Sequence, residues 1–134
     1  MGADDEVWLG GNDIDTEGTF KWSDENSTLM YSNFHETQPN NNNVFHGQDC
    51  LTMKSDGFWF DHSCAETQRF VCQWEVPCEH SLNETCYVFE DEQALTWENA
   101  EQFCNVNYGG NLVAIHDADT QRFLENMLIS AGNN

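Results

Sequence analysis

Two polar stretches in the first half of the chain carry the residue types best suited to ligand chemistry. Asp13, Asp15 and Glu17 alternate along an acidic segment, and residues 40–43 are four consecutive asparagines. Carboxylate and amide oxygens are the ligands that calcium takes, and they also hydrogen-bond polar ligands. We therefore predict a cation or polar-ligand site in these stretches. The alternative is a solvated loop that binds nothing.

The histidines and cysteines do not form the clusters that catalysis or zinc binding needs. The five histidines are scattered along the chain, and no nucleophile lies in a recognisable elbow. We predict that the chain is not an enzyme. The six cysteines include no pair of the Cys-x-x-Cys kind, which argues against zinc. Their even number suits three disulfides and an oxidising compartment, so we expect a secreted, extracellular protein.

Charge restricts the partners of the chain. The formal net charge is −20, from 24 acidic residues against four lysines and arginines. Such a chain repels phosphate backbones and anionic lipids, so we expect no nucleic-acid partner and no membrane surface. It attracts cations, basic proteins or mineral surfaces. The alternative is that the acidic face serves solubility alone.

Length and hydrophobicity are those of one soluble domain. The chain has 134 residues, 39% of them hydrophobic, which is enough to bury a core. No apolar run approaches the length of about 18 residues that a membrane span needs, so we expect no membrane insertion. The first six residues lack the basic and apolar regions of a secretion signal. Asn26 and Asn83 each begin a glycosylation sequon, in agreement with secretion.

Short strands and two helices must position these residues. Alternating or apolar runs predict strands at residues 7–10, 19–22, 50–53, 57–60, 69–74 and 87–89. Helical spacing predicts helices over 96–107 and 118–131, the first begun by a Thr96 cap and ended by Gly109 and Gly110. Residues 23–49 form a long polar loop, and a loop of that length in a compact domain is usually functional.

Several motifs in the first part of the chain resemble the C-terminal half of a C-type lectin-like domain. Residues 8–11 resemble the WIGL strand of that family, residues 38–40 its EPN loop with Pro39 as the cis proline, and residues 59–61 its WND motif. The resemblance implies an α+β fold, with two helices, small antiparallel sheets and a long irregular loop region.

The second part resembles the N-terminal half of the same domain. The resemblance lies in Cys78 to Tyr87, in Trp97 to Cys104 and in residues 111–116. Because the halves are in swapped order, we predict that residues 1–134 form a single circularly permuted domain, with 1–75 as the C-terminal half and 77–134 as the N-terminal half. A piece cut out of phase from tandem domains has the same order. We accordingly expect a monomer or a swapped dimer.

The resemblance also selects among the fifteen ways of pairing six cysteines. It implies three disulfides: Cys50–Cys64, Cys72–Cys104 and Cys78–Cys86.

In sugar-binding members of the family, one calcium ion bridges protein and sugar. The resemblance places its ligand positions at Gln38, Asn40, Gln48, Phe60 and Asp61. Only Asp61 brings a negative charge, and Phe60 brings no oxygen. Because calcium affinity depends on the number of charged oxygen ligands, we predict that this ion is weakly bound or lost.

An auxiliary calcium site of the family maps onto Asp13, Glu17, Asn41 and Asp49. These positions keep three carboxylates and one amide oxygen, so we predict that calcium binds here and orders the loop. The alternative is a mobile acidic loop.

The resemblance implies a secreted recognition module that binds a glycan or glycoprotein, with calcium as a loop-ordering ion. The alternative is a calcium-independent module on the same fold that binds a protein or mineral surface. Phe58, Trp59 and Phe60 provide either a sugar-stacking face or part of the core.

Overall fold

The computed structural model describes most of the chain: residues 6–14, 19–23, 28–29, 31–35, 50–75, 81–82 and 85–132. Within these ranges the elements are β1 (Glu6–Asn12), β2 (Lys21–Trp22), β3 (Cys50–Lys54), β4 (Trp59–His62), β5 (Gln68–Glu75), β6 (Ser81–Leu82), β7 (Thr85–Leu95), α1 (Trp97–Tyr108), β8 (Asn111–Leu112) and α2 (Ala118–Gly132).

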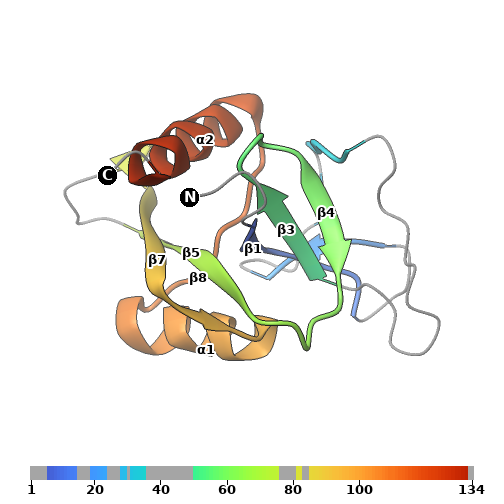
Figure 1. The fold of residues 1–134 in the computed structure, drawn as a ribbon, viewed down its shortest axis with the longest axis vertical. Coiled ribbons are helices and arrows are strands. Elements are labelled where there is room, and N and C mark those ends of the chain that lie inside the picture. The colour runs from blue at the N-terminus through green and yellow to red at the C-terminus, as the bar shows by residue number, and fades with distance from the viewer. Residues whose placement is uncertain are drawn as a thin grey trace.

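The strands of the described ranges form one eight-stranded sheet (Figure 1). Its main path runs β4-β3-β1-β5-β7-β6, with β2 paired to β1 and β8 paired to β5. The pair β1–β5 is parallel, and the other pairs are antiparallel. The predicted α+β fold with two helices is confirmed. The small sheets that we predicted are joined into one, because the parallel pair β1–β5 links them.

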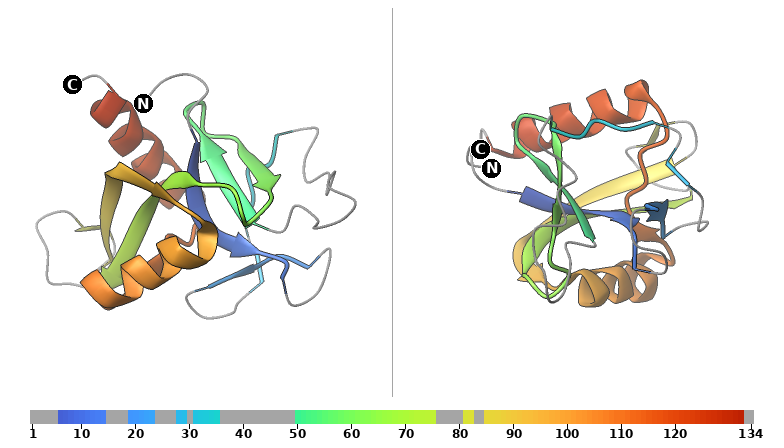
Figure 2. Two further views of the ribbon diagram at one scale, coloured as in Figure 1. Left: turned by 60° about the horizontal axis from the view of Figure 1, so that its bottom comes forward. Right: turned by 90° about the vertical axis from the view of Figure 1, so that its right-hand side faces the viewer.

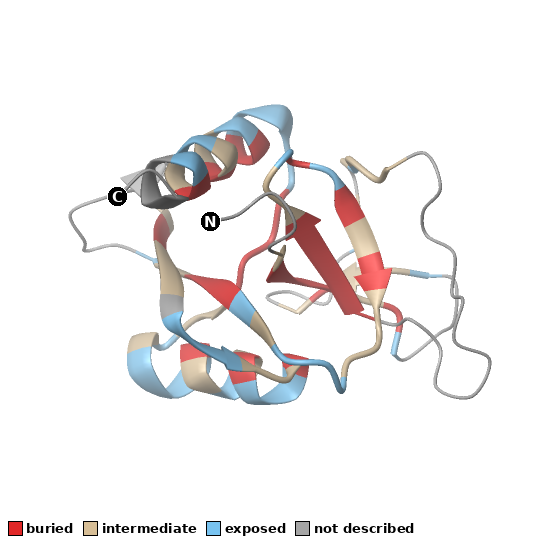
Figure 3. Ribbon diagram, viewed as in Figure 1, coloured by how far each residue is buried: buried red, intermediate tan, exposed pale blue. Residues whose placement is uncertain are grey.

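Strands β1 and β5 lie at the centre of this sheet and bury side chains on both of its faces. Successive residues of a strand point to opposite faces. On β1, Val7 and Leu9 belong to one buried cluster and Trp8 to the other, and on β5 Val71 and Phe70 are divided in the same way. Helix α2 contributes to the first cluster and α1 to the second, so the helices cover opposite faces (Figure 2). Figure 3 shows the buried residues gathered along the central strands.

Local capping sets the helix bounds, which lie within one residue of the predicted ones. The hydroxyl of Thr96 accepts the backbone N–H of Asn99 and caps α1. Gly109 ends α1 in the left-handed conformation, with φ of 70°, which glycine adopts without strain. Asp117 Oδ1 accepts the backbone N–H of Thr120 at 2.8 Å at the start of α2.

The two parts of the chain share the sheet. Strand β5 from the first part pairs with β7 and β8 from the second. The backbone N–H of Gly10 donates to the carbonyl of Val113 at 2.8 Å, and a disulfide joins Cys72 to Cys104. Whether residues 1–134 are one permuted domain stays a prediction.

Candidate functional site

Strand β4 turns the residues of the WND-like motif to alternate sides. Trp59 and Asp61 are buried, whereas Phe60 and His62 are half-buried. The indole N–H of Trp59 donates to Oε1 of Gln121 at 2.9 Å, inside the core under α2. Trp59 is therefore a core residue, and it is not available for stacking on a sugar.

Phe60 is the outward aromatic residue of this motif. The ring of His35 is stacked on it, with centroids 5.1 Å apart and planes at 23°. The ammonium Nζ of Lys54 lies 4.3 Å from the Phe60 centroid. Phe58 is exposed beside them, at 5.8 Å from the His35 ring. A cation and an imidazole thus engage Phe60, at a position where the resemblance places a calcium ligand.

Two buried carboxylates flank the first residues of β3. Asp13 follows β1 directly and is 3% exposed, and Asp61 on β4 is 2% exposed. Strand β3 lies between β1 and β4, with Cys50 paired to Asn12 and Leu51 paired to Asp61. The predicted polar loop ends at residue 49, directly before Cys50. Asp13 and Asp61 therefore lie near the end of that loop.

The burial of these carboxylates is what a cation would compensate. An ionised carboxylate in the interior needs donors or a positive charge around it. Oδ1 of Asp13 and Oδ1 of Asp61 are buried and accept no hydrogen bond, although each residue makes another interaction. Each predicted calcium set thus has one described carboxylate, and that carboxylate is buried.

The other predicted ligands, Gln38, Asn40, Gln48, Glu17, Asn41 and Asp49, lie outside the described residues, as do the sequon residues Asn26 and Asn83. Within the described ranges, no three His, Cys, Asp or Glu side chains are grouped so that they could hold a metal ion. Both calcium sets stay predictions. In the same part of the chain, no helix is long and apolar enough to cross a membrane.

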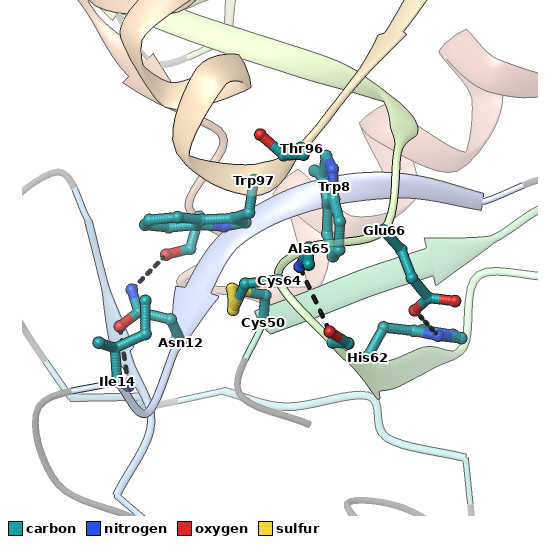
Figure 4. Close-up of a disulfide and its surroundings, with 12 residues drawn as sticks. Trp8, Asn12, Ile14, Cys50, His62, Cys64, Ala65, Glu66, Thr96 and Trp97 are labelled. Atoms are coloured by element: carbon teal, nitrogen blue, oxygen red, sulfur yellow. Dashed lines mark hydrogen bonds and ion pairs between the residues drawn. A yellow bond between two sulfur atoms is a disulfide. The ribbon is translucent and has the colours of Figure 1, made fainter. Parts of the chain in front are cut away.

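A charged cluster that the sequence did not reveal adjoins Asp61. His62 Nε2 lies 2.9 Å from Glu6 Oε1. Its Nδ1 lies 2.9 Å from Glu66 Oε2 (Figure 4). Thr52 also donates its hydroxyl to Glu6 Oε1 at 3.0 Å. The outward side of β4 is thereby tied to β1 across the intervening strand β3.

Electrostatics keep both partners of this cluster charged. The hydrogen bond to Glu6 holds the pKa of His62 above its ordinary value of 6.5, against the opposing effect of burial. Burial alone would raise the pKa of the Glu6 carboxyl, but the hydrogen bond and charge of His62 outweigh burial and hold that pKa below 4.5. The pair is an ion pair at mildly acidic pH.

Two of the three predicted disulfides are present among the described residues. Cys50–Cys64 fixes the start of β3 to the turn after β4, with Cα atoms 5.2 Å apart (Figure 4). Cys72–Cys104 joins β5 to α1. Cys86 is also disulfide-bonded, and its predicted partner Cys78 lies outside the described residues.

Sequence comparison identifies relatives of this chain. The family model described as "Lectin C-type domain" matches residues 2–74 and 93–134. C-type mannose receptor 2 of Rattus norvegicus is 29% identical over 145 residues, and the human receptor of that name is 30% identical. The alignment covers 92% of this chain and 9% of either receptor. Collectin-11 of Danio rerio is 35% identical over 69 residues, or 52% of this chain and 25% of the collectin.

Solved structures give partial matches. One is a cow C-type carbohydrate-recognition domain of CD23, crystallised in the presence of GlcNAc2Man3 oligosaccharide, with 37% identity and a TM-score of 0.40 over 44% of this chain and 43% of that one. Another is the carbohydrate-recognition domain of human scavenger receptor C-type lectin, with 29% identity and a TM-score of 0.43 over 47% and 49% of the two chains.

Proposed function

The chain belongs to the C-type lectin domain family, and from that membership we propose that it is an extracellular recognition module that binds glycans. The family consists of binding modules that are not enzymes, in agreement with the scattered histidines of the sequence. Carbohydrate-binding lectins are among its relatives, and the match spans 25% of the length of the longer Collectin-11.

The burial of Asp13 and Asp61 beside the start of β3 is the observation that carries the proposal. Calcium held by Asp13, Glu17, Asn41 and Asp49 would neutralise acids that otherwise repel one another. The ion would supply positive charge and fix the loop that leads into β3. These residues would then present a single loop surface to a glycan.

A calcium ion that bridges directly to a sugar is less well supported than a calcium ion that orders the loop. Phe60 offers a ring already engaged by His35 and Lys54, and no oxygen. Glycan binding should then depend on loop side chains that the ion orders, and single sugars should bind weakly.

Protein binding is the second candidate function. It is favoured by Phe60, which stands where the family resemblance places a calcium ligand. Phe60 brings no metal ligand there, and it places an aromatic ring with a lysine over it on the surface. The exposed ring of Phe58 extends that surface. A partner protein can use such aromatic groups as anchors without any metal.

A glycan array probed with calcium and again with EDTA tests the proposal. We expect binding that EDTA removes and that Asp13→Asn also removes. Glu98→Gln is the matched control, because Glu98 is an exposed carboxylate in the first turn of α1. Equal binding with calcium and with EDTA would refute a role for the ion. No binding to any glycan, with the fold intact by circular dichroism, would favour the protein-binding function.

A further inference from the structure

An open groove lies toward the β7 end of the strand order, away from the calcium candidates beside β1 and on β4. It has a volume of about 530 Å³, and its described lining comes from the ends of β5 and α1, the start of β7, the segment between α1 and α2, and the first turn of α2. None of the described lining residues belongs to β1, β2, β3 or β4; Asp13 directly follows β1, and Asp61 lies in β4. In Figure 1, β7 is at the left of the molecule and β4 is at the right. We call this hollow the β5–β7 groove.

Aromatic rings form one wall of the β5–β7 groove. Trp74 and Tyr108 are stacked, with centroids 4.5 Å apart and planes at 14°, and Tyr87 is a further lining residue of the groove. The wall depends on close packing between α1 and β5, because a Cβ on Gly110 would collide with the carbonyl oxygen of Gln73. Two stacked rings held in this way form a rigid face, which loses little conformational entropy when a ligand binds.

Carboxylates lie at the rim of the β5–β7 groove. Glu75 and Asp117 line it and are exposed, and its described lining contains no lysine or arginine. Hydrogen bonds from Thr120 hold the pKa of Asp117 below its ordinary value, so this carboxylate stays ionised and fixed at the start of α2. His116 also lines the groove and is exposed. The two carboxylates make the rim negative beside an aromatic wall.

We propose that the β5–β7 groove binds an arginine side chain on an exposed basic segment of a partner protein. A guanidinium is planar, stacks on aromatic faces and pairs with carboxylates, so it satisfies both features of the groove. A cation is also the partner that a chain of net charge −20 attracts. The groove is thus a protein-docking site separate from the loop surface proposed for glycans.

The indole signal of Trp74 provides a local readout. Trp8, Trp22 and Trp59 are fully buried, so their indole N–H signals in a nitrogen-15 NMR spectrum should not move when a ligand enters the groove. Trp74→Phe identifies the Trp74 signal by its loss. The probe is a short blocked peptide with one arginine flanked by glycines. Its match carries citrulline, which keeps the shape of arginine without its charge.

Three variants separate the groove from general attraction to an acidic protein. Glu75→Gln should weaken the arginine peptide about two- to five-fold, the value of one exposed charge pair. Glu92→Gln removes the same charge from an exposed position farther along β7 and should leave binding unchanged. Gly109→Asn should block binding: Gly109 lines the groove, a Cβ there meets no atom within 4 Å, and asparagine tolerates φ of 70°.

The proposal is supported if the arginine peptide shifts the Trp74 signal, the citrulline peptide does not, and the variants rank as stated. Equal binding of citrulline, equal weakening by Glu92→Gln, or unchanged binding to a folded Gly109→Asn would overturn it. A neutral disaccharide that displaced the peptide would overturn it in favour of a sugar site. EDTA and Asp13→Asn should not change peptide binding. The peptide test therefore stays valid even if the chain binds no glycan.

Discussion

The pair His62–Glu6 should make the stability of the protein depend on pH. The two side chains are 23% and 10% exposed and lie 2.9 Å apart. His62→Gln leaves the Glu6 carboxylate without its charged partner, while the hydroxyl of Thr52 still donates to it. Loss of a charged partner from such a site costs about 1–3 kcal/mol of unfolding free energy. For a chain of this size that corresponds to a fall in melting temperature of about 3–5 °C per kcal/mol.

The sign of the pH dependence follows from the two pKa shifts. The pKa of His62 is raised in the folded state, so its contribution is fully present below 6.5 and is lost as pH rises through the folded value. The pKa of Glu6 is lowered, so its contribution is present above 4.5 and is lost as pH falls through the folded value. The pair therefore stabilises the protein most between about 4.5 and 6.5.

Urea unfolding of a double-mutant cycle measures this pair. The cycle comprises wild type, His62→Gln, Glu6→Gln and the double variant, in EDTA so that no metal at Asp61 contributes. We expect a coupling energy at about pH 5.5 that falls by about half or more at pH 8.5, where a neutral imidazole keeps a hydrogen bond to the carboxylate without the ion pair. Glu66→Gln is the control: Glu66 is 49% exposed, so its effect should stay within about 1 kcal/mol. A coupling energy that is zero at pH 5.5, or equal at both pH values, would refute the reasoning.

The remaining predictions concern calcium and the joining of the two parts. Calcium should raise the melting temperature by binding the folded loop alone; differential scanning calorimetry should show that Asp13→Asn abolishes this gain and that Asp61→Asn leaves most of it. Replacing Cys72 and Cys104 together by alanine should cost about 3–4 kcal/mol in urea unfolding, as expected for a sequence separation of 32; a cost near zero would mean that the bond restricts little of the unfolded chain. Light scattering should find a monomer, whereas an obligate dimer would point to halves exchanged between chains.

The helices could be predicted closely because the signals that bound them are local. Thr96 caps α1 through a residue three positions away, and Gly109 ends it with its own backbone conformation. Asp117 begins α2 in the same manner as Thr96 begins α1. Such features depend on a few consecutive residues. No knowledge of the partners of each helix in space is needed.

The joining of the strands into one sheet could not be predicted from short motifs. The parallel pair β1–β5 brings Val7 beside Arg69, and no pattern within either strand specifies that pairing. The same holds for His62 and Glu6, which are 56 residues apart in sequence. Their meeting depends on the strand order β4-β3-β1, which is a property of the whole fold.

The roles of the aromatic residues in β4 were left open by the sequence for a related reason. Alternation predicts that Trp59 and Phe60 point to opposite faces, but it does not say which face is buried. The structure decides this through contacts from distant elements: Gln121 on α2 holds Trp59, and His35 stacks on Phe60. The candidate calcium residues that flank β3 were found because the resemblance aligned them, and their burial became visible only with the sheet.

The order of the two parts along the chain and their packing are separate questions. The alignment with the mannose receptors covers 92% of this chain, so both parts occur there in the same order. In the structure, the indole of Trp8 donates to the carbonyl of Leu95, and the indole of Trp97 donates to the carbonyl of Leu9. Strand β1, which directly precedes Asp13, is thus held by the second part of the chain. The proposed calcium and glycan site would need both parts packed together, whichever way the chain connects them.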